Sequence, residues 1–249
     1  MLEYVFLAFV GLLAGAMNAV AGGGTFVSVP ALIAAGVPSV AANMTSTVAL
    51  FPGAIASAYA FRKDFRAFGD ASPILLLGIS VAGGAVGALL LIVTSSRAFD
   101  ALVPWLLLMG AIAFAFGRQI GDWLRARVTL GKPALLIVQF LLGVYGGYFG
   151  GAVGLMMLAA WTIFGARDLI AMSAARTLIV GLTNATAVIF FVAIGTVYWT
   201  HVMVMLFAGV AGGYTGALIA KRIPVPVLRI GISCLNFAVT AAFFWKTFG

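Results

Sequence analysis

The chain has 249 residues, of which 64% are hydrophobic and only 8% are charged. A soluble domain carries about 25% charged residues, so this composition, with a mean hydropathy of +1.19, indicates a polytopic membrane protein. The net charge of +8 does not indicate a nucleic-acid-binding protein, because the basic residues lie in short segments between apolar runs.

The apolar runs follow one another along the whole chain. They cover residues 2–21, 25–36, 39–61, 72–94, 99–117, 133–149, 154–165, 168–194, 201–220 and 226–245. A helix needs about 20 apolar residues to cross a membrane, and the runs 25–36 and 154–165 are too short for that. Each follows a glycine-rich break, so we expect each to be the returning arm of a helical hairpin. A tilted and strained short span is the alternative.

The two breaks are polar, and they occupy comparable places in the chain. The first is GAMNAVAGGGTFVSVP at 15–30 and the second is GVYGGYFGGAVG at 143–154. Consecutive glycines disfavour a helix and allow left-handed backbone. A break at membrane depth needs polar partners inside the protein, and broken helices at corresponding positions of two halves indicate a transporter's binding site.

We therefore expect an all-α polytopic membrane protein of two inverted-topology repeats, each a glycine-broken helical hairpin plus three transmembrane helices. Residues 1–117 form the first repeat, 118–132 a cytoplasmic linker and 133–249 the second repeat. Three crossings per half is an odd number, which inverts the second half relative to the first. Small residues recur in both halves and predict close helix packing, namely Gly83, Gly84 and Gly87, and Gly212, Gly213 and Gly216.

The basic residues divide unequally between the two faces of this topology. One face receives eleven of them and the other only Arg97 and Lys246. The positive-inside rule assigns the richer face to the cytoplasm. We expect a multi-pass protein of the inner (plasma) membrane with both termini on the periplasmic or extracellular side.

Arg176 is the basic residue that lies deep in an apolar run, in the sequence SAARTLIVG. It sits about 12 Å along the helix that begins near residue 168. A charge at this depth is costly and by default indicates a functional site. Because no Asp or Glu lies deep in a membrane run, with Asp168 at the helix edge, the guanidinium invites an anionic ligand. The alternative is that Arg176 reaches the cytoplasmic interface or binds carbonyls at a hairpin tip.

Residues of both breaks and of the following helices complete the candidate site. The short arms begin at Thr25 and near Gly154, and a helix N-terminus attracts anions through free N–H groups and its dipole. For any single hydroxyl, back-bonding to its own helix is the alternative. The candidate substrate-binding residues are Asn18, Gly22, Gly23, Gly24, Thr25, Asn43, Thr45, Ser46, Thr47, Gly151, Gly154, Arg176, Thr177 and Asn184.

The sequence contains none of the motifs that would indicate an enzyme. It has no GxxxxGK[ST] phosphate loop, no cluster of metal ligands and no Ser/His/Asp set, so we expect no enzymatic activity, cofactor or metal. His201, the single histidine, lies at a loop boundary, and we interpret it as interfacial rather than as a proton carrier.

Three motifs carry a resemblance to a known family: NAVAGGGTFVSVPAL at 18–32, AANMTSTVA at 41–49 and GGYFGGAVGLMML at 146–158. In this order they resemble the sulfite exporter TauE/SafE family, membrane permeases of two related halves, and the likeness covers essentially the whole chain. The family's motif maps onto Asn18, Gly22, Gly23, Gly24, Thr25 and Pro30. The resemblance implies an exporter of sulfite or of small organosulfur anions such as sulfoacetate.

We expect transport by alternating access about a midplane anion site. Since no intramembrane acid is present to carry a proton or Na⁺, the membrane potential can drive export, at about 2.3 kcal/mol per 100 mV for a monovalent anion. An anion channel and a non-transporting structural membrane subunit are the alternatives. The expected partners are a small anionic substrate and the lipid bilayer, with no nucleic acid and with a homodimer left open.

Overall fold

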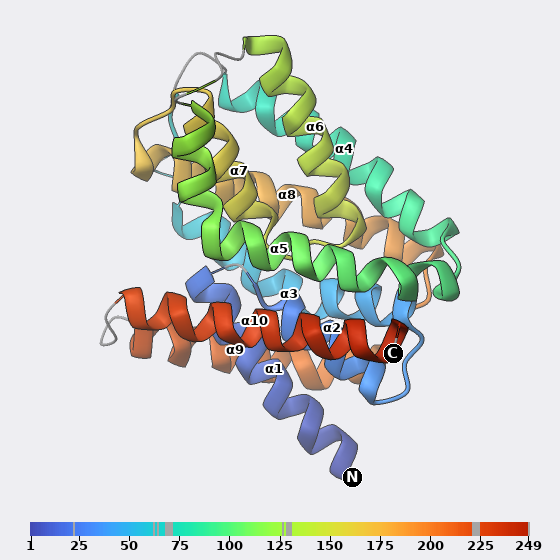
Figure 1. Ribbon diagram of the computed structural model, residues 1–249. Coiled ribbons are helices and arrows are strands. Elements are labelled where there is room, and N and C mark those ends of the chain that lie inside the picture. The colour runs from blue at the N-terminus through green and yellow to red at the C-terminus, as the bar shows by residue number, and fades with distance from the viewer. Residues whose placement is uncertain are drawn as a thin grey trace.

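The computed structural model describes residues 1–21, 23–61, 63, 65–67, 72–125, 127, 131–220 and 225–248. Within these ranges the fold is all-helical and has no β-strand (Figure 1). The helices are α1 (Leu2–Ala21), α2 (Thr25–Ala34), α3 (Ser39–Phe61), α4 (Pro73–Val93), α5 (Ser96–Arg125), α6 (Lys132–Tyr148), α7 (Val153–Ile163), α8 (Leu169–Ile194), α9 (Trp199–Ala220) and α10 (Val225–Phe248).

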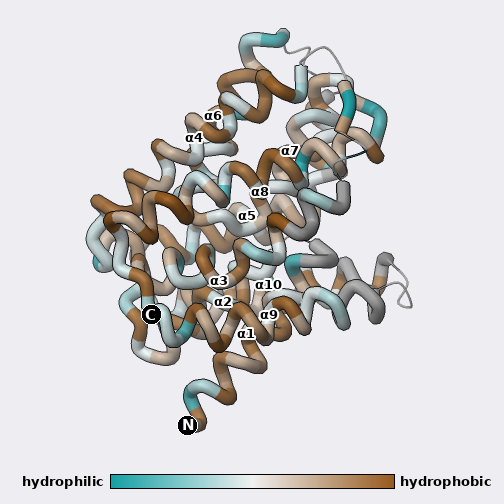
Figure 2. The backbone as a smooth tube through the Cα atoms, turned by 180° about the vertical axis from the view of Figure 1, so that it is seen from behind, coloured by the Kyte–Doolittle hydropathy of each residue, from teal (hydrophilic) through white to brown (hydrophobic). Residues whose placement is uncertain are grey.

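Several helices are long and apolar enough to cross a membrane. In the described residues, four segments are candidate membrane spans by length and composition, and they lie within α4, α5, α8 and α10. Large apolar side chains face outward on these and other helices, as Ile74 and Phe207 do with 72% and 67% of their surface exposed. Figure 2 shows apolar residues along most of the tube. Such exposure suits a hydrocarbon surrounding, so the structure agrees with a multi-pass membrane protein.

The helices α2 and α7 are the two short elements that the sequence predicts. They have 10 and 11 residues. At 1.5 Å per residue they are about 15 to 17 Å long, and neither can cross a hydrocarbon core of about 30 Å on its own.

The helix α5 is longer than the predicted run 99–117. It begins at Ser96 and continues to Arg125, so the first part of the segment 118–132, which we expect to be a linker, is helical. The reason is packing against α7: a Cβ built on Gly121 would lie 3.5 Å from the carbonyl oxygen of Ala159. The neighbouring Asp122 is exposed, so the helix can continue beyond the apolar layer with its charge in water.

Both termini lie on the same side of the molecule (Figures 1 and 2). The start of α1 meets the start of α9, where Glu3 Oε1 and His201 Nε2 are 3.0 Å apart. The turn between α2 and α3 meets the start of α5, where Ser39 Oγ donates to the Ser96 carbonyl over 3.3 Å. We call this side, which also includes the end of α10, the terminal face.

The opposite face joins the segment after α3 to the start of α8. Arg66 and Asp168 form an ion pair there, with 2.8 Å between Nη2 and Oδ2. The chain therefore leaves the terminal face along α1 and returns to it along α2. In the same way, it leaves the opposite face along α6 and returns to it along α7.

The helices α1 and α9 touch through their backbones. A Cβ built on Gly15 would overlap the carbonyl of Gly209, and one on Gly212 would overlap the carbonyl of Leu12. Any larger residue at these places would push the two helices apart, so glycine sets their distance.

The helices α4 and α6 meet in the same way. A Cβ on Gly87 would overlap the carbonyl of Val144, and one on Gly147 would overlap the carbonyl of Gly84. This confirms the predicted role of the small residues of α4, which lie against Gly143, Val144 and Gly147 of α6.

A buried polar chain ties α4, α6 and α7 together. Gln139 is 1% exposed, and its Nε2 donates to Ser80 Oγ over 2.6 Å. Trp161 Nε1 donates to Gln139 Oε1 over 2.7 Å. Because a buried amide without partners is costly, these bonds fix α7 against the pair of longer helices.

Two substitutions in α4 test the backbone contact. Gly87→Ala should destabilise the protein by about 1 to 3 kcal/mol, because the new methyl group must displace α6. Gly78→Ala is the matched control, since nothing lies within 4 Å of a Cβ there, and it should leave the stability unchanged or raise it by up to about 1 kcal/mol. Thermal unfolding of the purified variants measures both, and an equal loss in the two would contradict this packing.

Candidate functional site

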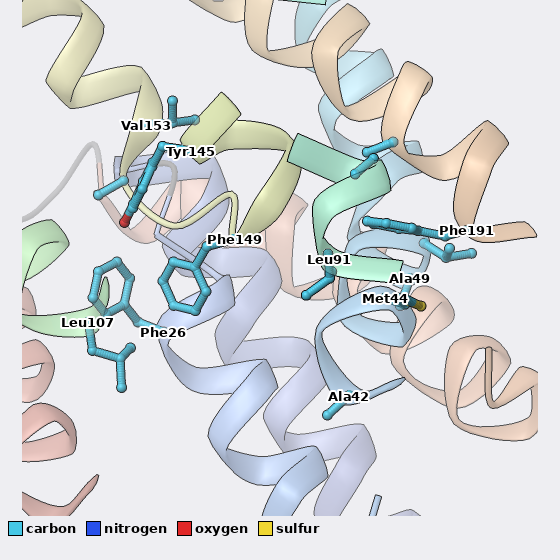
Figure 3. Packing of buried hydrophobic residues seen from close by; sticks show 14 of the residues in the cluster. Phe26, Ala42, Met44, Ala49, Leu91, Leu107, Tyr145, Phe149, Val153 and Phe191 are labelled. Atoms are coloured by element: carbon cyan, nitrogen blue, oxygen red, sulfur yellow. The ribbon is translucent and has the colours of Figure 1, made fainter. Parts of the chain in front are cut away.

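The two glycine-rich breaks lie against each other in the interior of the molecule. The first separates α1 from α2, and the second separates α6 from α7. A Cβ built on Gly151 would lie 3.1 Å from the ring of Phe26. That ring meets Phe149 edge-on with the centroids 6.3 Å apart (Figure 3). Two segments far apart in sequence thus form one junction, which we call the break junction.

Asn18 and Gly24 close the first break. The Gly24 N–H donates to Asn18 Oδ1 over 3.3 Å. Gly24 has a φ of −56°, and neither it nor Gly23 adopts the left-handed backbone that consecutive glycines allow. Glycine is needed at position 24 for another reason, since a Cβ there would lie 2.5 Å from the Ala14 carbonyl oxygen. Gly22, another candidate, lies outside the described residues.

The left-handed backbone occurs in the second break instead. Gly150 has a φ of +80° and Ala152 a φ of +58°. Ala152 precedes α7 and has no side-chain oxygen to cap it, and the N–H groups of Val153 and Gly154 donate no hydrogen bond within the described ranges. The N-terminus of α7 therefore presents free donors together with the positive end of the helix dipole.

The N-terminus of α2 differs from that of α7. The N–H groups of Phe26 and Val27 donate to the carbonyls of Gly23 and Gly24, each over 3.1 Å. Thr25 is partly buried, and its Oγ1 faces the second break. We expected free donors at both short helices, and this expectation was wrong for Phe26 and Val27.

Arg176 of α8 crosses the first turn of α7. A Cβ built on Gly154 would lie 3.0 Å from Cδ and 3.1 Å from Cγ of Arg176, so glycine leaves room for the arginine stem. Arg176 is partly buried, and in the described part of the chain its guanidinium forms neither a hydrogen bond nor an ion pair. An unpaired cation beside free helix N–H groups favours an anion as the ligand.

Asn43 of α3 holds the end of α6 at the second break. Its Nδ2 donates to the carbonyl of Tyr148, the last residue of α6, over 2.8 Å. Its Oδ1 is buried and without a partner among the residues described. Because the donor is used and the free atom is an acceptor, Asn43 in this conformation positions the break and offers nothing to an anion.

The hydroxyls of the same stretch of α3 are also engaged. Thr45 Oγ1 accepts from the Tyr198 N–H over 3.1 Å, which ties α3 to the connection between α8 and α9. Ser46 Oγ lies 2.6 Å from Ser28 Oγ, which ties α3 to α2. Thr47 Oγ1 donates over 2.9 Å to the carbonyl four residues earlier in its own helix.

Two further candidates lie on α8. Thr177 Oγ1 donates to the Ser173 carbonyl over 2.8 Å, as a back-bonded helix hydroxyl does. Asn184 is partly buried about 12 Å further along the helix than Arg176. The candidates gathered around the break junction are thus Asn18, Gly23, Gly24, Thr25, Asn43, Ser46, Gly151, Gly154 and Arg176.

Sequence reasoning missed two buried polar groups. Asn236 of α10 is 1% exposed, and both its Nδ2 and its Oδ1 are unpartnered within the described structure. Thr183 of α8 is also 1% exposed with an unpartnered Oγ1, while its methyl group fills the space left by Gly84 and Gly146. An amide in the apolar run 226–245 was the signal that pointed to Asn236.

Asp168 does not neutralise Arg176, because it is already engaged on the opposite face. Its Oδ1 accepts from the Ala171 N–H over 3.0 Å and caps α8, and its Oδ2 accepts from Arg66 Nε and Nη2 over 3.1 and 2.8 Å. The Ala171 N–H and then the Arg66 side chain hold the pKa of Asp168 below its ordinary value. Among the described residues, no group of His, Cys, Asp and Glu could hold a metal ion.

Sequence comparison finds relatives of this chain among proteins described as membrane transporters. Residues 7–243 match the family described as sulfite exporter TauE/SafE. The probable membrane transporter protein YfcA of Escherichia coli K12 is 27% identical over 244 residues, which cover 98% of this chain and 90% of the relative. A probable membrane transporter protein of Haemophilus influenzae is 30% identical over 236 residues, covering 93% and 91%. The probable membrane transporter protein ORF9 of a Sinorhizobium species is 31% identical over 225 residues, covering 89% and 82%. No solved structure matches significantly.

The depressed pKa of Asp168 predicts a pH dependence of stability. A carboxylate whose pKa is lower in the folded than in the unfolded state stabilises the fold above its unfolded pKa of about 3.9, and this contribution is lost as the pH falls through the folded value. Between neutral pH and about pH 3, the melting temperature should therefore fall more for the wild type than for Asp168→Asn. Asp122→Asn, at another exposed carboxylate, is the control and should follow the wild type. Parallel curves for all three proteins would contradict the assignment.

Proposed function

The chain belongs to the sulfite exporter TauE/SafE family of membrane transporters, which are not enzymes, and on this premise we propose that it exports small sulfur-containing anions, such as sulfite or organosulfonates. The proposed route is alternating access about an anion site at the break junction.

The observation that carries this proposal is the position of Arg176. Its stem lies across Gly154, and its guanidinium has no partner in the described residues. The guanidinium presents five donors in a planar fork that matches the oxygens of sulfite and sulfonate. The free N–H groups at the start of α7 add donors from the backbone, and their dipole favours negative charge.

The pairing of helices supports two inverted repeats. If each of the first five helices is matched with the helix five places later, the contact of α1 with α9 corresponds to that of α6 with α4. The contact of α3 with α9 likewise corresponds to that of α8 with α4, and the pairs α3–α8 and α5–α10 correspond to themselves. Since α1 starts at the terminal face and α6 at the opposite face, halves related in this way have opposite orientations.

In this proposal the repeats cover residues 1–117 and 133–249, and α1–α2 and α6–α7 are hairpins that enter from opposite sides. The uneven distribution of basic residues then assigns the terminal face to the periplasmic side of the inner membrane.

The packing of the break junction favours a carrier over an open channel. Phe26 and Phe149 are 0% and 1% exposed, and Tyr145 and Leu107 lie beside them (Figure 3). A closed apolar cluster at the level of the anion site must move before an ion can pass, as alternating access requires. Export then needs no coupling ion, because the membrane potential itself favours the exit of an anion by about 2.3 kcal/mol per 100 mV.

Flux through proteoliposomes tests the proposal. The wild type should transport labelled sulfite or an organosulfonate saturably, driven by an imposed potential and without a pH or Na⁺ gradient. Arg176→Gln should lower this flux roughly 10- to 100-fold, because it removes a charge-assisted contact with the anion. Its melting temperature in the absence of anion should stay the same or rise, since an unpaired cation is removed from membrane depth.

Lys132→Gln, at an exposed basic residue of α6, is the control and should transport normally. Unchanged flux in Arg176→Gln would show that Arg176 has a structural role. Single-channel currents would show that the protein is a channel and not a carrier. Strict dependence on a pH or Na⁺ gradient at zero potential would contradict potential-driven export.

A further inference from the structure

A cavity of about 510 Å³ opens on the terminal face, where the end of α2, the start of α5 and the end of α10 meet. Arg97 and Lys246 both line it. They are the two basic residues that the topology assigns to this face, so the positive charge of a whole face converges on one cavity.

The charge in this cavity is available to a ligand. Arg97 and Lys246 are exposed and form neither an ion pair nor a hydrogen bond with any described residue. Asp100 lines the same cavity and offsets one of the two charges, which leaves the mouth positive. The positive N-terminal end of α5 at Ser96 is offset by the negative C-terminal ends of α2 and α10 at the same cavity, so the excess positive charge comes from the side chains.

The inner face of α10 leads from this cavity into the protein. Thr247 and Phe243 line the cavity, and Thr240 and Asn236 follow them inward at helical spacing. Thr240 and Asn236 are 3% and 1% exposed. The amide of Asn236 has no partner for either of its polar atoms in the described structure, so both atoms are available to a bound group.

One turn further inward, α10 reaches the first break. Ile232 packs there with Met17 of α1 and with Val27 of α2. The polar positions of α10 therefore connect the cavity on the terminal face with the neighbourhood of the break junction.

We propose that this cavity is a second anion site, an outer vestibule in which Arg97 and Lys246 hold a small oxyanion, and that Asn236 contacts the anion on its way to or from the break junction. The proposal rests on the proposed function for the identity of the anion. It adds a place where the anion binds on the terminal face, at a distance from Arg176.

Counterflow of a labelled organosulfonate in proteoliposomes tests the vestibule. Arg97→Gln combined with Lys246→Gln should raise the half-saturation concentration on one side of the membrane roughly 3- to 10-fold, with the maximal rate unchanged, because the charges collect the anion but do not take part in the central exchange. High ionic strength should remove the difference. Lys63→Gln combined with Lys132→Gln removes the same charge from the opposite face and should not change that half-saturation concentration.

Asp100→Asn gives an effect of the opposite sign. It removes the negative charge from the vestibule, so the half-saturation concentration on the same side should fall roughly 2- to 3-fold. A merely structural role of these side chains would not make one substitution weaken and another strengthen the affinity at the same face.

A binding measurement that needs no transport separates the vestibule from the central site. Cys234 is the single cysteine, so Cys234→Ser gives a background in which Ala101→Cys, at an exposed residue of the cavity lining, carries a single thiol and leaves Arg97 and Lys246 in place. In lipid nanodiscs, methanesulfonate should slow the modification of this thiol by a charged reagent several-fold, also when Arg176→Gln is present. Protection without any wild-type flux would support the vestibule and overturn the proposed function. Flux that depends on Arg176, with neither protection nor a shift in half-saturation, would overturn the vestibule alone.

The lipid composition distinguishes a soluble anion from a lipid headgroup, which offers the same oxyanion chemistry. Protection by methanesulfonate in nanodiscs of purely zwitterionic lipid supports the vestibule. If the thiol is protected in proportion to the phosphatidylglycerol content and methanesulfonate has no effect, the vestibule proposal is wrong.

Asn236→Leu tests the inward path. It should lower the maximal rate several-fold while the melting temperature stays equal or rises, because an apolar side chain of similar size replaces an unpartnered amide. A normal maximal rate in this variant would show that Asn236 does not contact the anion on its path.

Discussion

The backbones of two helices can touch only where no Cβ atom lies between them. Two helix pairs of this protein meet in that way. Gly15 and Gly212 bring α1 onto α9, and Gly87 and Gly147 bring α6 onto α4. Because α1 and α6 are the long helices that lead into the two breaks, these contacts fix where each break lies. The breaks then meet across the bundle, and α2 and α7 return from the junction to opposite faces.

This arrangement determines the electrostatics of the centre. The hydroxyls of α3 are engaged in bonds to α2, to its own backbone and to the connection after α8, so they hold the junction together. The positive side of the junction is left to Arg176 and to the start of α7, where Gly154 admits the arginine stem. A cation that the protein does not neutralise raises the cost of the empty state, and a bound anion would relieve that cost.

The strongest constraints on a membrane chain could be predicted from sequence. Hydropathy predicted the order and approximate bounds of the helices, and Arg176 was conspicuous as a charge within an apolar run. The extension of α5 to Arg125 was missed, because its packing on α7 through Gly121 cannot be read from charge alone. The left-handed Ala152 was missed as well, since alanine gives no signal for that conformation. Nor could the sequence tell that Gly24 serves a close approach rather than a turn, or that Asn236 faces inward, because both depend on which helices become neighbours.

Anion-dependent thermal stabilisation of the purified protein is the most direct test of an anion site at Arg176. The wild type and Arg176→Gln would be compared with sulfite, sulfoacetate, sulfate, taurine and a plain carboxylate. Sulfite or a sulfonate should raise the Tm of the wild type, because a ligand at a hundredfold excess over its Kd adds about 2.7 kcal/mol to the free energy of unfolding. The Tm of the variant should not change. Equal stabilisation of both proteins would contradict an anion site at Arg176.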